Sequence, residues 1–115
     1  MKNCGYRLGA LAAMLLLTGS AFAGAPETRA ELANMVLQDC GSCHGMTLKG
    51  GLGPPLRPDD LKLQSVEGIA AIISEGVDGT AMPPWKPLLT DEQMFWISRQ
   101  LKSGALLTNE TKDAQ

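Results

Sequence analysis

Hydrophobic residues recur every three or four positions in three segments of the chain, a spacing that places them on one face of an α-helix. The three segments are residues 25–39, 66–75 and 91–103. Pro26 suits the first turn of the first helix, and Ser65 and Thr90 are placed to cap the starts of the other two. Gly76 and Gly104 follow the second and third segments as stop signals. The pattern therefore predicts three helices.

Two irregular segments separate these helices. Glycine and proline are concentrated in residues 45–62 and recur in 77–89, and both residue types interrupt regular structure. No segment alternates hydrophobic and polar residues as a half-buried strand does. We therefore expect an all-α domain with three main helices and two loops. Cys40 is expected at the end of the first helix, with Gly41 and Gly45 loosening the backbone after it.

Residues 1–23 are typical of an export signal. A short basic start precedes an apolar run over residues 8–18, and Ala21-Phe22-Ala23 has the small-residue pattern of a cleavage site. The apolar run is shorter than the about 20 residues of a membrane-spanning helix, so a retained anchor is the less favoured alternative. Cleavage would leave one domain, residues 24–115, with a polar tail from about residue 105.

Cleavage would also remove Lys2, Arg7 and Cys4. The full chain has a net charge of −2, so the loss of two cations gives −4. An acidic chain has no electrostatic reason to bind nucleic acid or an anionic membrane surface. We expect a monomer that does not insert stably into a membrane.

The remaining cysteines and the single histidine lie together in Cys40-Gly41-Ser42-Cys43-His44. This is the signature of c-type haem attachment, in which two thiols bond to the vinyl groups and the imidazole coordinates the iron. An exported thiol pair that has no such use tends to oxidise. A carbonyl of the stiff Pro54-Pro55 segment is expected to accept a hydrogen bond from the other ring nitrogen of His44.

Met82 is expected to be the second axial ligand of the iron. The prolines that follow hold its backbone extended and stiff, and it lies 38 positions beyond His44. The other methionines of residues 24–115 either lie too near His44 or lie on hydrophobic helix faces, where methionine usually packs; they are Met46, Met35 and Met94. Iron bound by an imidazole and a thioether has no open position, which suits electron transfer and not catalysis.

Two other kinds of cysteine site fit the sequence less well. A dithiol oxidoreductase places its cysteines after a strand and at the start of a helix, whereas this pair follows a predicted helix. A structural zinc site needs four ligands, and only three strong ones are present here. Neither alternative uses the histidine that adjoins Cys43.

The order of these motifs resembles that of class I small cytochromes c. The resemblance covers nearly all of residues 24–115 and rests on Cys40–His44, on Gly53-Pro54-Pro55-Leu56 and on Met82-Pro83. It implies an all-α fold wrapped around one covalently bound haem c. It also implies that the Pro54 carbonyl accepts the hydrogen bond from His44.

The resemblance further implies that the first and last helices cross closely. Ala33 and Val36 would then contact Phe95 or Trp96. Val36 stands four residues before the first cysteine, where the family commonly has an aromatic residue. The helix contact is therefore expected to depend more on Trp96.

More narrowly, the run from Cys40 to Gly51, together with Met82-Pro83-Pro84-Trp85, resembles the periplasmic cytochrome c55X of denitrifying bacteria. That group is associated with the cd-type nitrite reductase. The resemblance implies a periplasmic, non-enzymatic carrier of single electrons to or within the nitrite reductase system, with redox proteins as partners. The alternative is a cytochrome that assists in making or handling the special haem of that reductase.

Two further residues are candidate contacts of the haem propionates. Arg57 could pair with a propionate, although an exposed and solvated arginine is as common an outcome. Trp85 could donate its indole N–H, although simple packing of its ring is the alternative. Lys49 and Lys86 could flank an exposed haem edge and meet an acidic partner, but isolated lysines usually serve only solubility.

Overall fold

The computed structural model describes residues 24–108. Its elements are α1 (Arg29–Met35), the π-helical turn η1 (Val36–Cys40), α2 (Gly41–His44), α3 (Val66–Glu75) and α4 (Asp91–Ser103). No strand is present within residues 24–108, so the predicted all-α fold is confirmed. The expected export signal and residues 109–115 of the expected tail lie outside the described residues. Within the described part, no helix is long and apolar enough to cross a membrane.

The first helix begins at Arg29 and not at residue 25 as predicted. Thr28 is its N-cap: the Thr28 side chain accepts a hydrogen bond from Glu31 N–H, and the Glu31 carboxylate accepts one from Thr28 N–H at 3.0 Å. Pro26 therefore precedes the helix. The Thr-x-x-Glu pattern that marks this start was present in the sequence.

The expectation that the helix ends at Cys40 was also wrong. Gly41 has helical dihedral angles (φ −61°, ψ −27°), and its N–H points to the carbonyl of Val36, five residues back, as in a π-turn. The helical path continues through α2 to His44. Gly45 ends it with φ +89°, and a Cβ there would lie 2.7 Å from the Gly50 carbonyl oxygen. The attachment motif is thus part of one helical segment that runs from Arg29 to His44.

The second and third helices form as predicted. Ser65 Oγ accepts a hydrogen bond from Gly68 N–H at the start of α3. Thr90 and Gln93 make a capping box at the start of α4, and Gly104 ends α4 in the left-handed conformation. Local signals were sufficient here because each cap satisfies backbone groups within a few residues of itself.

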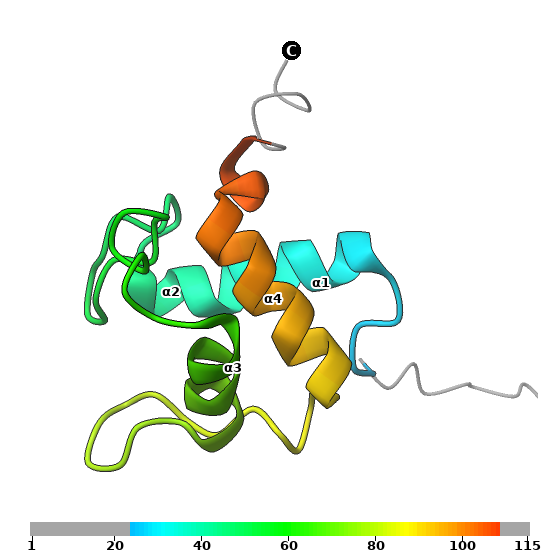
Figure 1. The fold of residues 1–115 in the computed structure, drawn as a ribbon. Coiled ribbons are helices and arrows are strands. Elements are labelled where there is room, and N and C mark those ends of the chain that lie inside the picture. The colour runs from blue at the N-terminus through cyan, green and yellow to red at the C-terminus, as the bar shows by residue number, and fades with distance from the viewer. Residues whose placement is uncertain (1–23, 109–115) are drawn as a thin grey trace, which may run out of the picture.

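The last helix crosses the first helical segment, and α4 also packs against α3 (Figure 1). Val36 is 0% exposed in the core, and Ala33, Phe95 and Trp96 pack against the same core, in agreement with the expected helix contact. Polar groups add to this crossing. The most buried hydrophobic residues come from α1, η1, α3, α4 and the segments beside them: Leu32, Val36, Leu48, Leu61, Ile69, Leu89, Met94, Ile97, Leu101 and Leu106.

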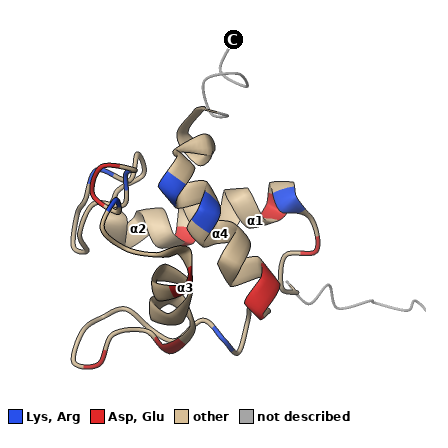
Figure 2. Ribbon diagram, viewed as in Figure 1, with Lys and Arg blue, Asp and Glu red and all other residues tan. Residues whose placement is uncertain are grey.

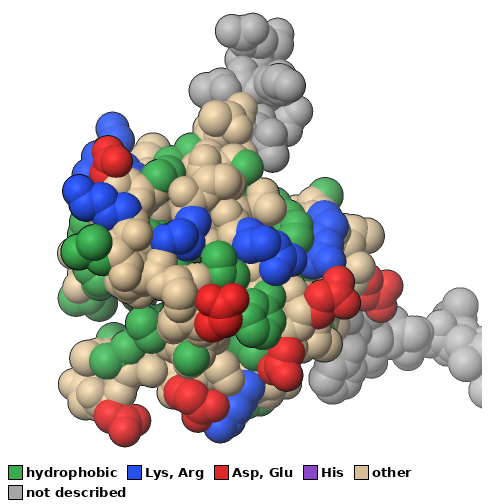
Figure 3. Space-filling view, viewed as in Figure 1, with side chains coloured by type: hydrophobic (Ala, Val, Ile, Leu, Met, Phe, Trp, Pro, Cys, Tyr) green, Lys and Arg blue, Asp and Glu red, His purple; other side chains and the backbone are tan. Residues whose placement is uncertain are grey.

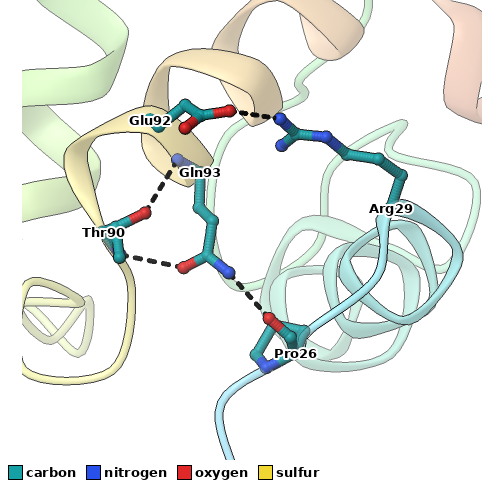
Figure 4. A network of polar contacts seen from close by, with 5 residues as sticks. All are labelled: Pro26, Arg29, Thr90, Glu92 and Gln93. Carbon is teal, nitrogen blue, oxygen red and sulfur yellow. Dashed lines mark hydrogen bonds and ion pairs between the residues drawn. The ribbon is translucent and has the colours of Figure 1, made fainter.

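A polar network joins the start of α1 to the start of α4 (Figure 4). Arg29 Nη2 lies 2.6 Å from a carboxylate oxygen of Glu92, and the Arg29 guanidinium lies 5.2 Å from the centroid of the Trp96 ring. The Gln93 side-chain amide donates a hydrogen bond to the Pro26 carbonyl at 2.7 Å. These contacts link segments more than 60 residues apart in the sequence.

Charged side chains of both signs are spread over the surface (Figures 2 and 3). Two basic residues lie along α4, and the segment 45–64 carries lysine, arginine and aspartate side by side. Lys102 also anchors the end of that segment, because its ammonium group donates hydrogen bonds to the carbonyls of Leu61 and Gln64. The view in Figure 3 shows hydrophobic side chains at the left edge, where Figure 1 places the two loops.

Candidate haem site

A cavity of about 860 Å³ lies between the two loops and the helices. Its volume is within the range of about 300–1,000 Å³ that is usual for small-molecule and cofactor sites. Most of its lining residues are apolar, and they include Ile69 and Ile73 of α3 and Ile97 and Leu101 of α4. Seven residues were predicted from the sequence to contact the haem or to orient its ligand. Six of them line the cavity: Cys40, Cys43, His44, Pro54, Met82 and Trp85.

His44 is held in one orientation at the end of α2. Its side chain is buried, and Nδ1 lies 2.7 Å from the carbonyl oxygen of Pro54. Because a carbonyl can only accept, this contact places the proton on Nδ1 and leaves the lone pair on Nε2. A neutral imidazole fixed in this tautomer is the form that binds a metal ion. The structure therefore places the Pro54 carbonyl where the sequence expected it.

Gly53 packs directly against the His44 ring, a contact that the sequence did not reveal. A Cβ at residue 53 would lie 2.8 Å from both Nδ1 and Cε1 of the imidazole. Backbone hydrogen bonds hold the loop in place, from Gly53 N–H to the Cys43 carbonyl and from Gly50 N–H to the His44 carbonyl, each at 2.8 Å. Only a residue without a side chain allows the Pro54 carbonyl to reach Nδ1 along this path.

The two cysteines of the motif are both free thiols on the cavity wall. Burial, and to a lesser extent the negative charge of Asp39, raises the pKa of the Cys40 thiol to about 11. A dithiol oxidoreductase needs the opposite, a thiolate stabilised near neutral pH. The environment of Cys40 therefore disfavours that alternative.

Met82 lines the cavity from the second loop, and its side chain is half-buried. Its carbonyl accepts a hydrogen bond from Val77 N–H at 3.2 Å, and its own N–H donates to Thr80 Oγ1 at 3.3 Å. At the base of the loop, Trp85 N–H donates to the Ile73 carbonyl of α3 at 3.0 Å. The loop is thus mounted on the C-terminal end of α3.

The other methionines in residues 24–108 do not line the cavity. Met94 is 2% exposed in the core, Met35 packs against that core, and Met46 is 50% exposed. Among the methionines of residues 24–108, Met82 is therefore the one that lines the same cavity as His44.

Trp85 and Arg57 occupy different positions relative to the cavity. Trp85 lines it and packs against the core, so both of its predicted uses remain compatible with its place. Arg57 does not line it: its Nε donates to Asp60 Oδ2 at 3.0 Å, and Asp60 is the residue at the cavity wall. The contact of Arg57 or Trp85 with a propionate stays a prediction. Of the lysines, Lys86 pairs with Glu75 at 2.7 Å and Lys49 is exposed.

The donor set and the walls fit a porphyrin. Apolar side chains would cover its faces, two thiols stand beside each other, and an imidazole and a thioether share the same space. Within residues 24–108, the acidic side chains that line the cavity are Asp39 and Asp60, and no lysine or arginine does so. In the same residues, no three His, Cys, Asp or Glu side chains converge as a metal-ion site of their own.

Comparisons with known proteins identify the family of this chain. The profile of a family described as cytochrome c oxidase, cbb3-type, subunit III matches residues 26–99. Cytochrome c55X of Paracoccus denitrificans (strain Pd 1222) is 46% identical over 90 residues, which cover 76% of this chain and 87% of that protein. Cytochrome c55X of Stutzerimonas stutzeri is 41% identical over 100 residues, 85% of this chain and 88% of that one.

A solved structure described as c-type cytochrome NirC has the same fold. It superposes with a TM-score of 0.67 at 42% sequence identity and covers 70% of this chain and 98% of its own. The family match, the identities of the relatives and this shared fold all indicate a c-type cytochrome. The chain belongs to the cytochrome c55X family and is a c-type cytochrome, a haem-containing electron carrier.

Proposed function

We propose that this cytochrome carries single electrons in the periplasm, to or within the nitrite reductase system of a denitrifying cell. Support for the pathway comes from relatives that carry the names cytochrome c55X and NirC. Support for the compartment comes from the leader-like residues 1–23.

One observation favours an electron carrier over a haem enzyme: His44 and Met82 line the same cavity. The haem supplies an iron that gains and loses one electron. His44, through Nε2, and Met82, through its sulfur, would hold this iron, and with both bound no coordination position would be open to a substrate. Thioether ligation would also raise the reduction potential by favouring the ferrous form.

The protein's own residues have distinct tasks in this proposal. The Pro54 carbonyl accepts a hydrogen bond from Nδ1–H of His44, so the lone pair of the neutral ring lies on Nε2. Cys40 and Cys43 would hold the haem covalently, each by adding its sulfur to one carbon and its thiol hydrogen to the other carbon of a vinyl double bond. Apolar residues of α3 and α4 exclude water from the cavity and so keep reorganisation on electron transfer small.

The covalent attachment is tested by mass. The cleaved chain, produced in a host that attaches haem c, should exceed the mass of residues 24–115 by one haem. After cell fractionation it should be found in the periplasm. A purified mass equal to that of the bare chain would overturn the site assignment.

The electron-transfer role is tested by rapid mixing. The reduced holoprotein is mixed with an oxidised cd-type nitrite reductase, and oxidation is followed at several salt concentrations. We expect fast oxidation whose rate changes with salt, because docking of charged surfaces is screened by ions. The absence of transfer at every salt concentration would overturn the proposal and favour the haem-handling role.

A further inference from the structure

The residue that ends α3 lies against the backbone of the Met82 loop. Gly76 has φ +68° and ψ −164°, a region open essentially to glycine. A Cβ at residue 76 would lie 2.6 Å from the Pro83 carbonyl carbon, 2.7 Å from the Met82 carbonyl oxygen and 2.8 Å from the Pro84 nitrogen. All three are backbone atoms, so no side-chain rotation could relieve the contact.

The loop also has little freedom to move away. Val77 N–H binds the Met82 carbonyl, and Trp85 N–H binds the Ile73 carbonyl. Lys86 Nζ pairs with the Glu75 carboxylate at 2.7 Å, which joins the two ends of the loop. Two consecutive prolines, Pro83 and Pro84, stiffen the segment that Gly76 contacts. A displacement at Gly76 would therefore be passed on to Met82.

We propose that Gly76 is a positioning residue for the Met82 sulfur. The inference rests on the proposed function, in which Met82 is an axial ligand. The missing side chain at residue 76 lets the loop approach the end of α3 closely, and this approach sets how far Met82 reaches into the cavity. The Pro83 carbonyl carbon lies 2.6 Å from the position that a Cβ of residue 76 would take, whereas ordinary contact with a Cβ begins at 3.4 Å. An alanine at residue 76 would therefore push this carbon away by about 0.8 Å.

Gly104, which ends α4 and does not line the cavity, offers a control. It also has a positive φ, +74°, and a Cβ there would approach only the side chain of Pro58, 3.0 Å from Cγ. Gly76→Ala and Gly104→Ala both place a side chain at a positive φ. Only Gly76→Ala adds a collision with the backbone that carries Met82.

The experiment compares the holoproteins of the wild type and both variants. The measurements are the weak red absorption band that a thioether gives with ferric haem, the reduction potential, and the pH at which the band disappears. We expect Gly76→Ala to lose about half of the band or more, with a lower potential and a lower pH of loss, because thioether ligation raises the potential. Gly104→Ala should match the wild type in all three.

Equal behaviour of the two variants would overturn the proposal. If Gly76→Ala alone does not yield folded protein, the double variant Gly76→Ala/Pro84→Ala is compared with Pro84→Ala. Replacing Pro84 makes the backbone between residues 83 and 84 less stiff, so it can move away from the added Cβ. A weaker band in the double variant supports the proposal, and an equal band overturns it. The proposed ligand set is judged separately: it fails if Met82→Ala leaves the band of the wild type unchanged, whatever Gly76→Ala does.

Discussion

Gly53 lies so close to the His44 imidazole that a Cβ on it would stand 2.8 Å from Nδ1. The same ring nitrogen is 2.7 Å from the Pro54 carbonyl, so the ring is enclosed by two consecutive residues of one loop. Contact and hydrogen bond together leave the imidazole a single orientation. The loop therefore acts as a rigid support for the ligand.

Gly53→Ala should lower the free energy of unfolding by about 1–3 kcal/mol, the usual effect of forcing extra volume into a packed site. Urea unfolding of the ferric holoprotein measures it. Gly68→Ala is the control, because that glycine lies in α3 and a Cβ there would meet only Ser65 Oγ, at 3.2 Å. Equal stability of Gly53→Ala and the wild type would show that the ring yields without cost.

Met82→Ala should abolish the red band of the ferric protein and lower its reduction potential, because the thioether leaves the iron. Met46→Ala is the matched control, since Met46 is 50% exposed and does not line the cavity. Spectra and potentiometric titration of both variants measure the effect. A band that persists in Met82→Ala and vanishes in another methionine variant would identify a different ligand.

Lys86→Met should weaken the pH dependence of stability in acid. The hydrogen bond from Lys86 is the main cause that holds the pKa of Glu75 below its ordinary value. A carboxyl with a lowered folded-state pKa stabilises the protein above its unfolded pKa of about 4.3, and this contribution is lost as the pH falls through the folded pKa.

Thermal unfolding midpoints between about pH 2 and 6 test this dependence. The difference between the wild type and Lys86→Met should be present at pH 6 and vanish at the acid end. Lys49→Met changes an exposed lysine that is in none of the ion pairs of residues 24–108, and it controls for the loss of one positive charge. A constant difference at every pH would exclude the ion pair as its source.

Arg29→Ala should destabilise the crossing of α1 and α4 more than Glu92→Ala does. Arg29 contacts both Glu92 and the Trp96 ring, whereas Glu92→Ala removes only the exposed ion pair. We expect a loss of about 1 kcal/mol for Arg29→Ala and about 0.5 kcal/mol for Glu92→Ala. Chemical unfolding of both variants measures the difference, and equal losses would mean that the Trp96 contact contributes nothing.

The boundaries that the sequence predicted well are those set by local caps. Ser65, Thr90 and Gly104 act on backbone groups a few residues away, so their effects can be read without a fold. Gly41 was misread because its helical conformation depends on packing. It is buried, and a Cβ there would lie 3.4–3.5 Å from Met46, which folds back over the helix.

The same distinction applies to the site. Cys40, Cys43, His44 and Met82 carry chemistry in their side chains, so their types and spacing were informative. Gly53 and Gly76 have no side chain, and from the sequence they indicated only a loop and the end of a helix. Their importance lies in what they approach, the His44 ring and the Met82 backbone, and both approaches exist only once the chain has folded.

The π-helical turn at Val36–Cys40 has a consequence for changes in chain length. A π-turn holds one residue more than an α-turn, because its hydrogen bonds span five residues and not four. Removing one residue within Val36–Cys40 would let the π-turn become an α-turn. The helix that follows, α2, would then keep its orientation relative to α1. Removing one residue from α1 would instead rotate Cys40 and His44 by about 100° relative to what precedes them. Val36–Cys40 can thus lose one residue without rotating the haem-attachment motif, whereas α1 cannot.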